Sequence, residues 1–180
     1  KILEKIVNDI HCYAKENIHG LKPHQIEKAL FSFHAHYFDN NNKTFNLQFF
    51  LNEQCKDAMN LSDFVDTFQL EFAALENVGK VGYVEGISDI IIKKLNEMDV
   101  YKRPIHCSDL KRDVLYIKEN NQWTKETDDK PLLKNAIKQV TNKNIKQIQD
   151  WKNLNPDCTK SDSRKNDQYL KIIMNSMSGG

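Results

Sequence analysis

Apolar residues recur at helical spacing along most of the chain. Residues 1–18 carry apolar side chains at i, i+3, i+4 and i+7 positions, and Gly20 follows where a helix C-terminal cap is common. The same spacing continues over residues 23–37 until the Asp-Asn-Asn-Asn run at 39–42 interrupts it. We therefore predict an N-terminal helical hairpin. Residues 44–56 are apolar without a clean period, so a short helix and an extended segment both stay open.

A second helical pair is predicted after this segment. Ser62 precedes an apolar stripe in the way that an N-cap residue does, and the stripe predicts one helix that ends near Gly79. A tight connection then leads to a helix with apolar positions from Val84 to Met98. The glycines at 79, 82 and 86 lack the spacing and the Lys-Ser/Thr pair of a phosphate loop, so we expect them to allow close helix approach.

Extended structure is predicted in the middle of the chain. Residues 104–107 and 114–118 have strand character. Asn120-Asn121 then favours a hairpin turn, because asparagine tolerates positive φ, and residues 122–124 supply a return strand. We expect a small antiparallel sheet.

The C-terminal third returns to helical patterns. Asp128 or Asp129 is expected to cap a helix that starts at Pro131, and a shift of the apolar register at 141–144 predicts a bend or a new helix. Asn155-Pro156-Asp157 should end that region. A polar capping stretch and a last amphipathic helix follow, with its apolar positions at Tyr169, Leu170, Ile173 and Met177.

These elements predict a mainly helical α+β protein, with helical hairpins, a small antiparallel β-hairpin sheet and C-terminal helices. We divide it into residues 1–56, the N-terminal helical hairpin and connector, and residues 57–180, which we expect to pack as one compact unit. A 180-residue chain is long enough to bury roughly 70% of its unfolded surface. No apolar run approaches the length of a membrane span, so no membrane partner is expected.

The cysteines and histidines offer little metal or catalytic chemistry. The four cysteines lack Cys-x-x-Cys spacing, which favours free thiols in an intracellular compartment. His34 and His36 would point about 200° apart on a helix, so we predict neither a metal site nor a cofactor. His106-Cys107 pairs a base with a nucleophile, but adjacent strand residues project to opposite faces. We expect one of the two to be buried and assign no catalytic residue.

Basic residues are the more informative feature. Residues 1–79 contain 7 basic and 11 acidic side chains, whereas residues 80–180 contain 19 and 14. Lysines recur every four residues on the helix predicted from Pro131, opposite its apolar face. Such a stripe fits phosphate contacts, and a solvated surface is the alternative. The candidate nucleic-acid-binding residues are Lys102, Arg103, Lys111, Arg112, Lys130, Lys134 and Lys138.

Several segments resemble a region shared by uncharacterised proteins of giant DNA viruses, the mimivirus-like group. They are YKRPIHCSD at 101–109, RDVLYIK at 112–118, WTKE at 123–126, NKNIKQIQDW at 142–151, NDQYLKI at 166–172 and MSGG at 177–180. The resemblance spans about residues 55–180. In that family the region follows a Cys/His zinc-finger-like segment and an Asn-rich or coiled linker, none of which is present here. The resemblance implies a viral protein of the host cytoplasm, in the viral factory, or of the virion.

We therefore expect a non-enzymatic binding module of a viral DNA- or RNA-associated protein, which contacts phosphates through basic residues near the β-hairpin and the following helix. The alternative is a structural or oligomerisation domain that mediates protein–protein assembly, as a homo-oligomer or with a viral protein partner. A hydrolase with Cys107 or His106 in its centre is a third possibility.

Overall fold

The computed structural model describes residues 47–109 and 114–178, so the predicted N-terminal hairpin and Gly179-Gly180 lie outside the described residues. Within these ranges the protein is a mainly helical α+β fold with one three-stranded antiparallel sheet, as predicted. Its elements are α3 (Leu47–Phe49), the π-helical turn η2 (Phe50–Gln54), α4 (Leu61–Asp66), α5 (Phe72–Val81), α6 (Tyr83–Asn96), the 3-10 turn η3 (Val100–Lys102), β1 (Ile105–Asp109), β2 (Val114–Glu119), β3 (Gln122–Lys125), α7 (Pro131–Leu154), the 3-10 turn η4 (Pro156–Thr159) and α8 (Arg164–Met177).

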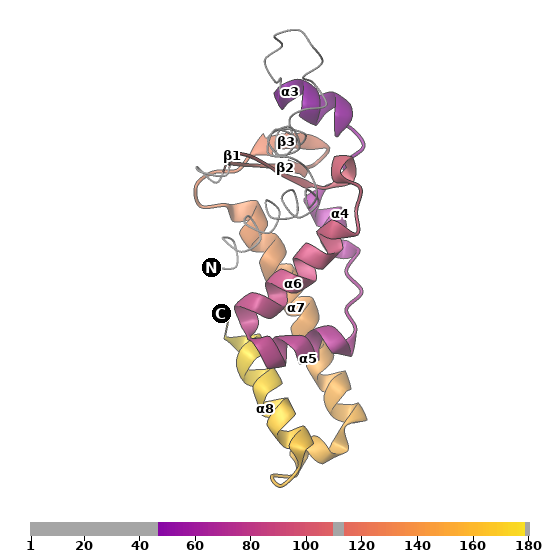
Figure 1. Cartoon of the computed structure of the whole chain (residues 1–180), viewed down its shortest axis with the longest axis vertical. Coiled ribbons are helices and arrows are strands. Elements are labelled where there is room, and N and C mark those ends of the chain that lie inside the picture. Colours follow the sequence, from indigo (N-terminus) through magenta and orange to yellow (C-terminus); the bar gives the residue numbers. More distant parts are fainter. Residues whose placement is uncertain (1–46, 110–113, 179–180) are drawn as a thin grey trace, which may run out of the picture.

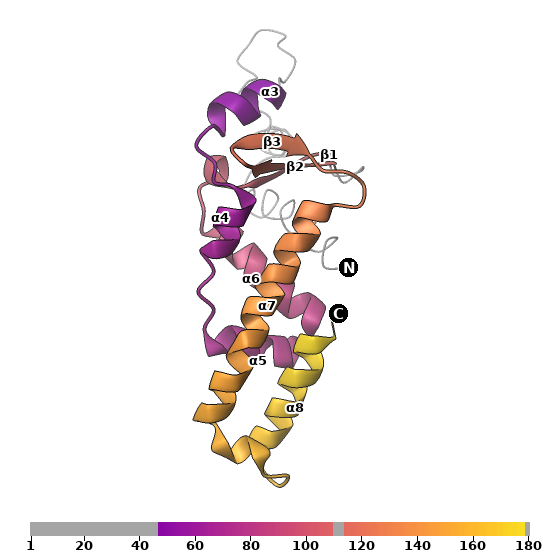
Figure 2. The same cartoon turned by 180° about the vertical axis from the view of Figure 1, so that it is seen from behind.

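The described part of the molecule is elongated. Figure 1 shows the sheet and α3 toward one end, and the loop between α7 and α8 at the other. The view from behind shows α7 running along most of the long axis, with α8 returning beside its second half (Figure 2). Helix α5 contacts both α7 and α8. Because α7 extends from the sheet to the helical end, it connects both parts of the fold.

The three strands follow the order β1-β2-β3, with Ile117 paired to Ile105 on one side and to Thr124 on the other. Asn120 and Asn121 adopt φ values of 51° and 60°, which is the pair of positive angles that a two-residue type I′ hairpin requires. The Asn-Asn dipeptide therefore forms the predicted turn.

The main core lies between one face of the sheet and helices α4, α6 and α7. Ile105, Leu115 and Ile117 project into it from β1 and β2. A separate cluster at the other end joins α5, α7, η4 and α8 through Leu75, Trp151, Cys158 and Ile172. The opposite face of the sheet packs against residues 47–58, which form a third small cluster. Residues 47–54 are helical, so the helical alternative for this segment is the one observed.

The single helix predicted from Ser62 to Gly79 is wrong, because α4 ends at Asp66 and α5 begins at Phe72. The apolar spacing of residues 64–75 is compatible with one continuous helix, but residues 67–71 are not helical. The Nζ of Lys143 on α7 donates to the carbonyl oxygen of Val65 at 2.8 Å and so binds the free end of α4. A side chain 78 residues away thus stabilises this helix end.

The N-caps predicted at Ser62 and at Asp128 or Asp129 are wrong, since glutamates from the hairpin occupy those roles, whereas in the predicted capping stretch Ser163 Oγ accepts the N–H of Lys165 at 3.1 Å at the start of α8. The backbone N–H of Ser62 donates to Glu119 Oε2 at 3.0 Å, and the N–H of Leu133 donates to Glu126 Oε1 at 3.1 Å. The residue before α7 is Lys130 in a left-handed conformation, and its side chain makes no cap hydrogen bond. Negative charge is favourable at both helix N-termini because the first N–H groups lack intrahelical acceptors.

Helix α7 continues through residues 141–144, so no new helix begins there. Thr141 and Asn144 are buried although they are polar, and Thr141 exchanges a hydrogen bond with the Tyr83 hydroxyl at 3.1 Å. The buried face of α7 therefore includes polar residues, and these cannot be predicted from the spacing of apolar residues alone. In α8 the fully buried positions are Ile172 and Ser176, whereas Leu170 and Met177, which we assigned to its apolar face, are exposed.

Gly79 and Gly86 have the predicted role of allowing close helix approach, whereas nothing lies within 4 Å of a Cβ atom built at Gly82. A Cβ atom at Gly79 would lie 2.7 Å from the side chain of Ile172 on α8, and one at Gly86 would lie 2.7 Å from Val78 Cα on α5. Gly82, with φ of 97°, forms the turn between α5 and α6. In the two ranges that the structure covers, we find no helix that combines the length and apolar character needed to span a bilayer.

Candidate functional site

The start of α7 is fixed relative to the β-hairpin. Glu126 follows β3 directly and is 8% exposed, and its backbone N–H donates to the Leu115 carbonyl at 2.9 Å. Its carboxylate also receives the N–H of Leu133 from the first turn of α7. Glu126 therefore connects the β-hairpin to the first turn of α7.

The outward face of α7 is basic and rich in amides. Asp150 is the only acidic residue in the whole helix, and it lies near the C-terminal end. The exposed lysines and amides are Lys134, Asn135, Lys138, Gln139, Asn142, Lys146, Gln149 and Asn153. We name Lys134, Lys138 and Lys146 together with these amides the α7 polar face. At 1.5 Å per residue its lysines span about 18 Å along the helix axis.

Lys146 was not among the predicted residues. It follows Lys138 by eight residues, which is close to two turns, and the helical period alone would have placed it near the same side. The predicted interruption at 141–144 concealed this relation. Lys143, in contrast, points to α4, where its Nζ lies 3.7 Å from Asp66 Oδ1.

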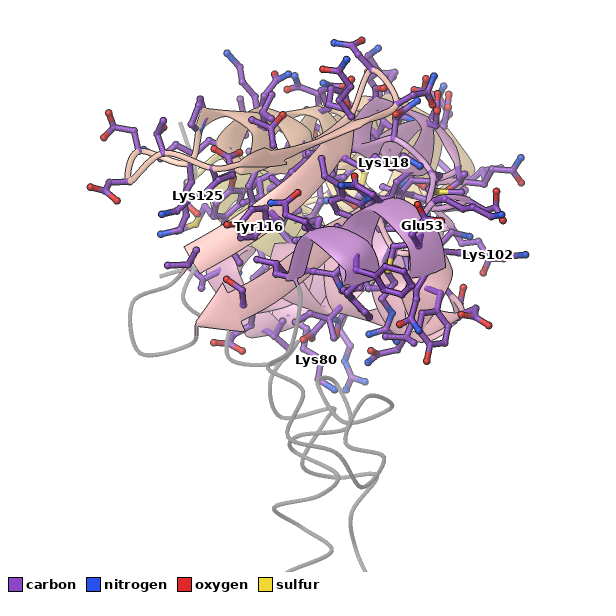
Figure 3. The ribbon with its side chains drawn as sticks, turned by 90° about the horizontal axis from the view of Figure 1, so that it is seen from above. Glu53, Lys80, Lys102, Tyr116, Lys118 and Lys125 are labelled. Atoms are coloured by element: carbon purple, nitrogen blue, oxygen red, sulfur yellow. The ribbon has the colours of Figure 1, made fainter. Side chains whose placement is uncertain are left out.

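The remaining predicted residues are not gathered on this face. Lys102 is exposed in η3, and Figure 3 shows it projecting on the side of the sheet opposite Lys125. Arg103 is only 3% exposed, and its guanidinium donates to the Met98 carbonyl at 3.5 Å, so it is a core residue and not a surface cation. Lys111 and Arg112 lie outside the described residues.

The segment before α7 has a slight excess of negative charge. Lys125 and Lys130 flank the buried Glu126 and the exposed Asp128 and Asp129, so two positive and three negative side chains lie in this segment. Lys130 is half-buried. The excess of positive charge therefore begins at Lys134 on the helix.

A cysteine–histidine contact lies on the other face of the sheet. The Sγ atom of Cys55 is 3.5 Å from His106 Nε2, although 51 residues separate the two in sequence. The His106 ring also contacts Phe50 edge-on at 5.2 Å between centroids and Trp123 at 5.3 Å. Cys55 is 0% exposed and His106 is 4% exposed. Because no local spacing relates the two residues, the sequence contains no signal for this pair.

The charge states of this pair do not suit nucleophilic catalysis. Burial raises the pKa of the Cys55 thiol to about 12, although the nearby Lys118 acts in the opposite direction. Burial also lowers the pKa of His106 to about 3, and the positive charge of Arg103 contributes to that decrease. Both groups are thus neutral near pH 7, whereas a cysteine nucleophile requires the thiolate.

Cys107 does not complete a catalytic pair with His106. His106 is buried among Phe50 and Trp123, while Cys107 packs against the main core on the other side of the strand. One of the two residues is therefore buried, as predicted, and adjacent side chains in the strand point to opposite faces as expected. Among residues 47–109 and 114–178, no three His, Cys, Asp or Glu side chains come together as metal ligands.

Comparisons with protein-family models, with curated proteins and with solved structures find no match to this chain. Fold and site together describe a mainly helical α+β protein whose longest helix presents a basic, amide-rich face.

Proposed function

We propose that this protein is a non-enzymatic nucleic-acid-binding module that contacts phosphates through the α7 polar face. The observation that carries the proposal is the composition of this face, where Lys134, Lys138 and Lys146 are exposed and the only acid of the helix is Asp150. Lysines attract the phosphate backbone, and amide side chains donate hydrogen bonds to phosphate oxygens. The resemblance to giant-virus proteins supports a role at viral DNA or RNA, in the viral factory or the virion.

The predicted binding mode is electrostatic and does not distinguish one nucleic-acid sequence from another. Each phosphate neutralised on a duplex contributes about 0.9 to the slope of log affinity against log salt, so the three lysines should contribute roughly 2.7. Discrimination between bases requires contacts to base edges, which this proposal does not include.

The test replaces Lys134, Lys138 and Lys146 together with glutamine. A matched control replaces Lys56, Lys80 and Lys93, which are also exposed, so that the net charge changes equally. Fluorescence anisotropy with labelled duplex and single-stranded probes should show a lower salt slope and strongly weakened binding for the α7 variant. The control should retain most of the salt slope.

Two results would contradict the proposal. One is undetectable binding of the unmodified chain to either probe at low salt. The other is equal loss in both triple variants, which would show that affinity depends on net charge and not on the α7 polar face. Thermal melting of each variant establishes that the fold is intact.

The alternative function, protein–protein assembly, is favoured by a different observation. Three large apolar side chains of α8 are exposed, namely Leu170, Met174 and Met177. A hydrolase has less support, because the Cys55–His106 pair is neutral and enclosed.

A further inference from the structure

Helix α8 has a second apolar face in addition to the one that packs against the protein. Ile172 is fully buried against α5 and α7, whereas Leu170, Met174 and Met177 are 50%, 70% and 62% exposed. Their spacing of four and three residues places the three side chains on one stripe of the helix. We name them the α8 apolar stripe. An exposed stripe with this spacing is the pattern by which paired helices recognise each other.

A basic groove borders this stripe. The groove between α5 and α8 has a volume of about 520 Å³, and the positively charged residues that line it are Lys80, Arg164 and Lys171. None of these three forms an ion pair with another residue in the described ranges. Of the two carboxylates in the groove, Glu76 already accepts a hydrogen bond from Trp151 Nε1 at 2.8 Å. Asp167 is the other, so cations exceed acids here.

The stripe and the groove are adjacent on α8. Lys171 is three residues from Met174, and Asp167 is three residues from Leu170, so these neighbours lie on the same side of the helix. A segment lying along the apolar stripe would therefore place one of its own edges beside Lys171 and the groove.

We propose that the α8 apolar stripe and the α5–α8 groove form a docking surface for an amphipathic helix of a partner protein that carries acidic side chains along one edge. Apolar anchors of that helix would cover Leu170, Met174 and Met177. Its carboxylates would pair with Lys80, Arg164 and Lys171, which supply the complementary charge. This surface is separate from the α7 polar face, so the inference goes beyond the proposed nucleic-acid contact.

A second copy of the chain fits this surface less well. In a symmetric antiparallel pair of α8 helices, equivalent edges of the two helices face each other. Arg164 and Lys171 of one copy would then approach Arg164 and Lys171 of the other, with only Asp167 to offset them. Like charges at the edge of a helix pair disfavour the pairing.

The experiment uses a fluorescein-labelled synthetic helix of about 15 residues with leucines at i, i+4 and i+7 and glutamates along one edge. A second peptide has lysines in place of the glutamates. Anisotropy titrations should show that the chain binds the glutamate peptide at least about tenfold more tightly. The double variant Lys80→Glu/Lys171→Glu should reverse this preference, and Met174→Glu should weaken binding of both peptides.

A charge-reversal control at Lys56 and Lys93, which are exposed and belong neither to the α5–α8 groove nor to the α7 polar face, should keep the original preference. Equal affinity for the two peptides, or no saturable binding up to about 1 mM, would overturn the proposal. Light scattering gives a further decisive result, because a dimer that Met174→Glu dissociates would identify a second copy as the occupant and would reject the acidic partner helix. Melting curves of the variants exclude unfolding as the cause of any loss.

Discussion

The enclosed ring of His106 makes the stability of this protein depend on pH. The folded state holds the pKa of His106 at about 3, against an ordinary value of 6.5, mainly because burial disfavours the charged ring. Between these two pH values the unfolded chain binds a proton at His106 and the folded chain does not. The free energy of unfolding is therefore highest above pH 6.5 and falls as the pH decreases through this window.

The expected loss can be worked out from these values. One proton bound only by the unfolded state lowers the free energy of unfolding by about 1.4 kcal/mol for each pH unit. Between pH 7 and pH 5 the total is about 2 kcal/mol, because the full slope develops only below the unfolded pKa. At alkaline pH the Cys55 thiol acts in the opposite sense, since its pKa of about 12 in the folded state exceeds the ordinary 9.0. The neutral Cys55 thiol therefore contributes to the free energy of unfolding below pH 9, and this contribution is lost as the pH rises further.

Urea denaturation followed by tryptophan fluorescence at pH 7, 6 and 5 measures this loss. The control is His106→Leu, which keeps an apolar side chain beside Phe50 and Trp123 and removes the titrating ring. All other histidines precede residue 47 and are the same in both chains, so the difference between the two pH profiles isolates His106. Parallel losses in the two chains would refute the assignment of this pH dependence to the buried ring.

Two further predictions concern the helical packing. Asn144 is 0% exposed, and neither polar atom of its amide has a hydrogen-bond partner among residues 47–109 and 114–178. Asn144→Leu should therefore raise the free energy of unfolding by about 1–3 kcal/mol. The control Asn142→Leu, on the exposed side of the same helix, should change it little. A loss of stability in chemical denaturation would instead show that the Asn144 amide is hydrogen-bonded. Gly86→Ala should destabilise the fold by about 1–3 kcal/mol, despite the higher helix propensity of alanine, because the new methyl group would lie 2.7 Å from Val78 Cα. An unchanged urea midpoint for this variant would mean that α5 and α6 separate without cost.

Several parts of the fold follow from short stretches of sequence. The Asn120-Asn121 dipeptide specifies its turn because both residues accept positive φ, and the flanking β-prone runs then pair as a hairpin. The helix from Tyr83 to Asn96 follows from the spacing of its apolar residues. The end of α7 follows from Pro156, which does not continue a helix. The exposure of Lys134 and Lys138 is also a local result, because these residues lie opposite the apolar face of their helix.

Other features depend on residues that meet only in the folded chain. Glu119 and Glu126 cap helices whose own sequences offered Ser62 and Asp128 or Asp129 as candidates. A lysine of α7 also binds the end of α4. A local pattern cannot show which distant side chain will reach a free N–H or carbonyl group.

The candidate site also combines features of local sequence with features that depend on long-range contacts. By itself the sequence determined the mainly helical α+β class, the hairpin and the lysine face of α7, since periodicity and turn preference act over a few neighbouring residues. Only the tertiary structure decided that Arg103 is buried, that Cys55 meets His106 across 51 residues, and that an apolar stripe of α8 stays uncovered beside a basic groove. Burial and long-range contacts depend on where the entire chain runs, so these three features could not be read from any one segment.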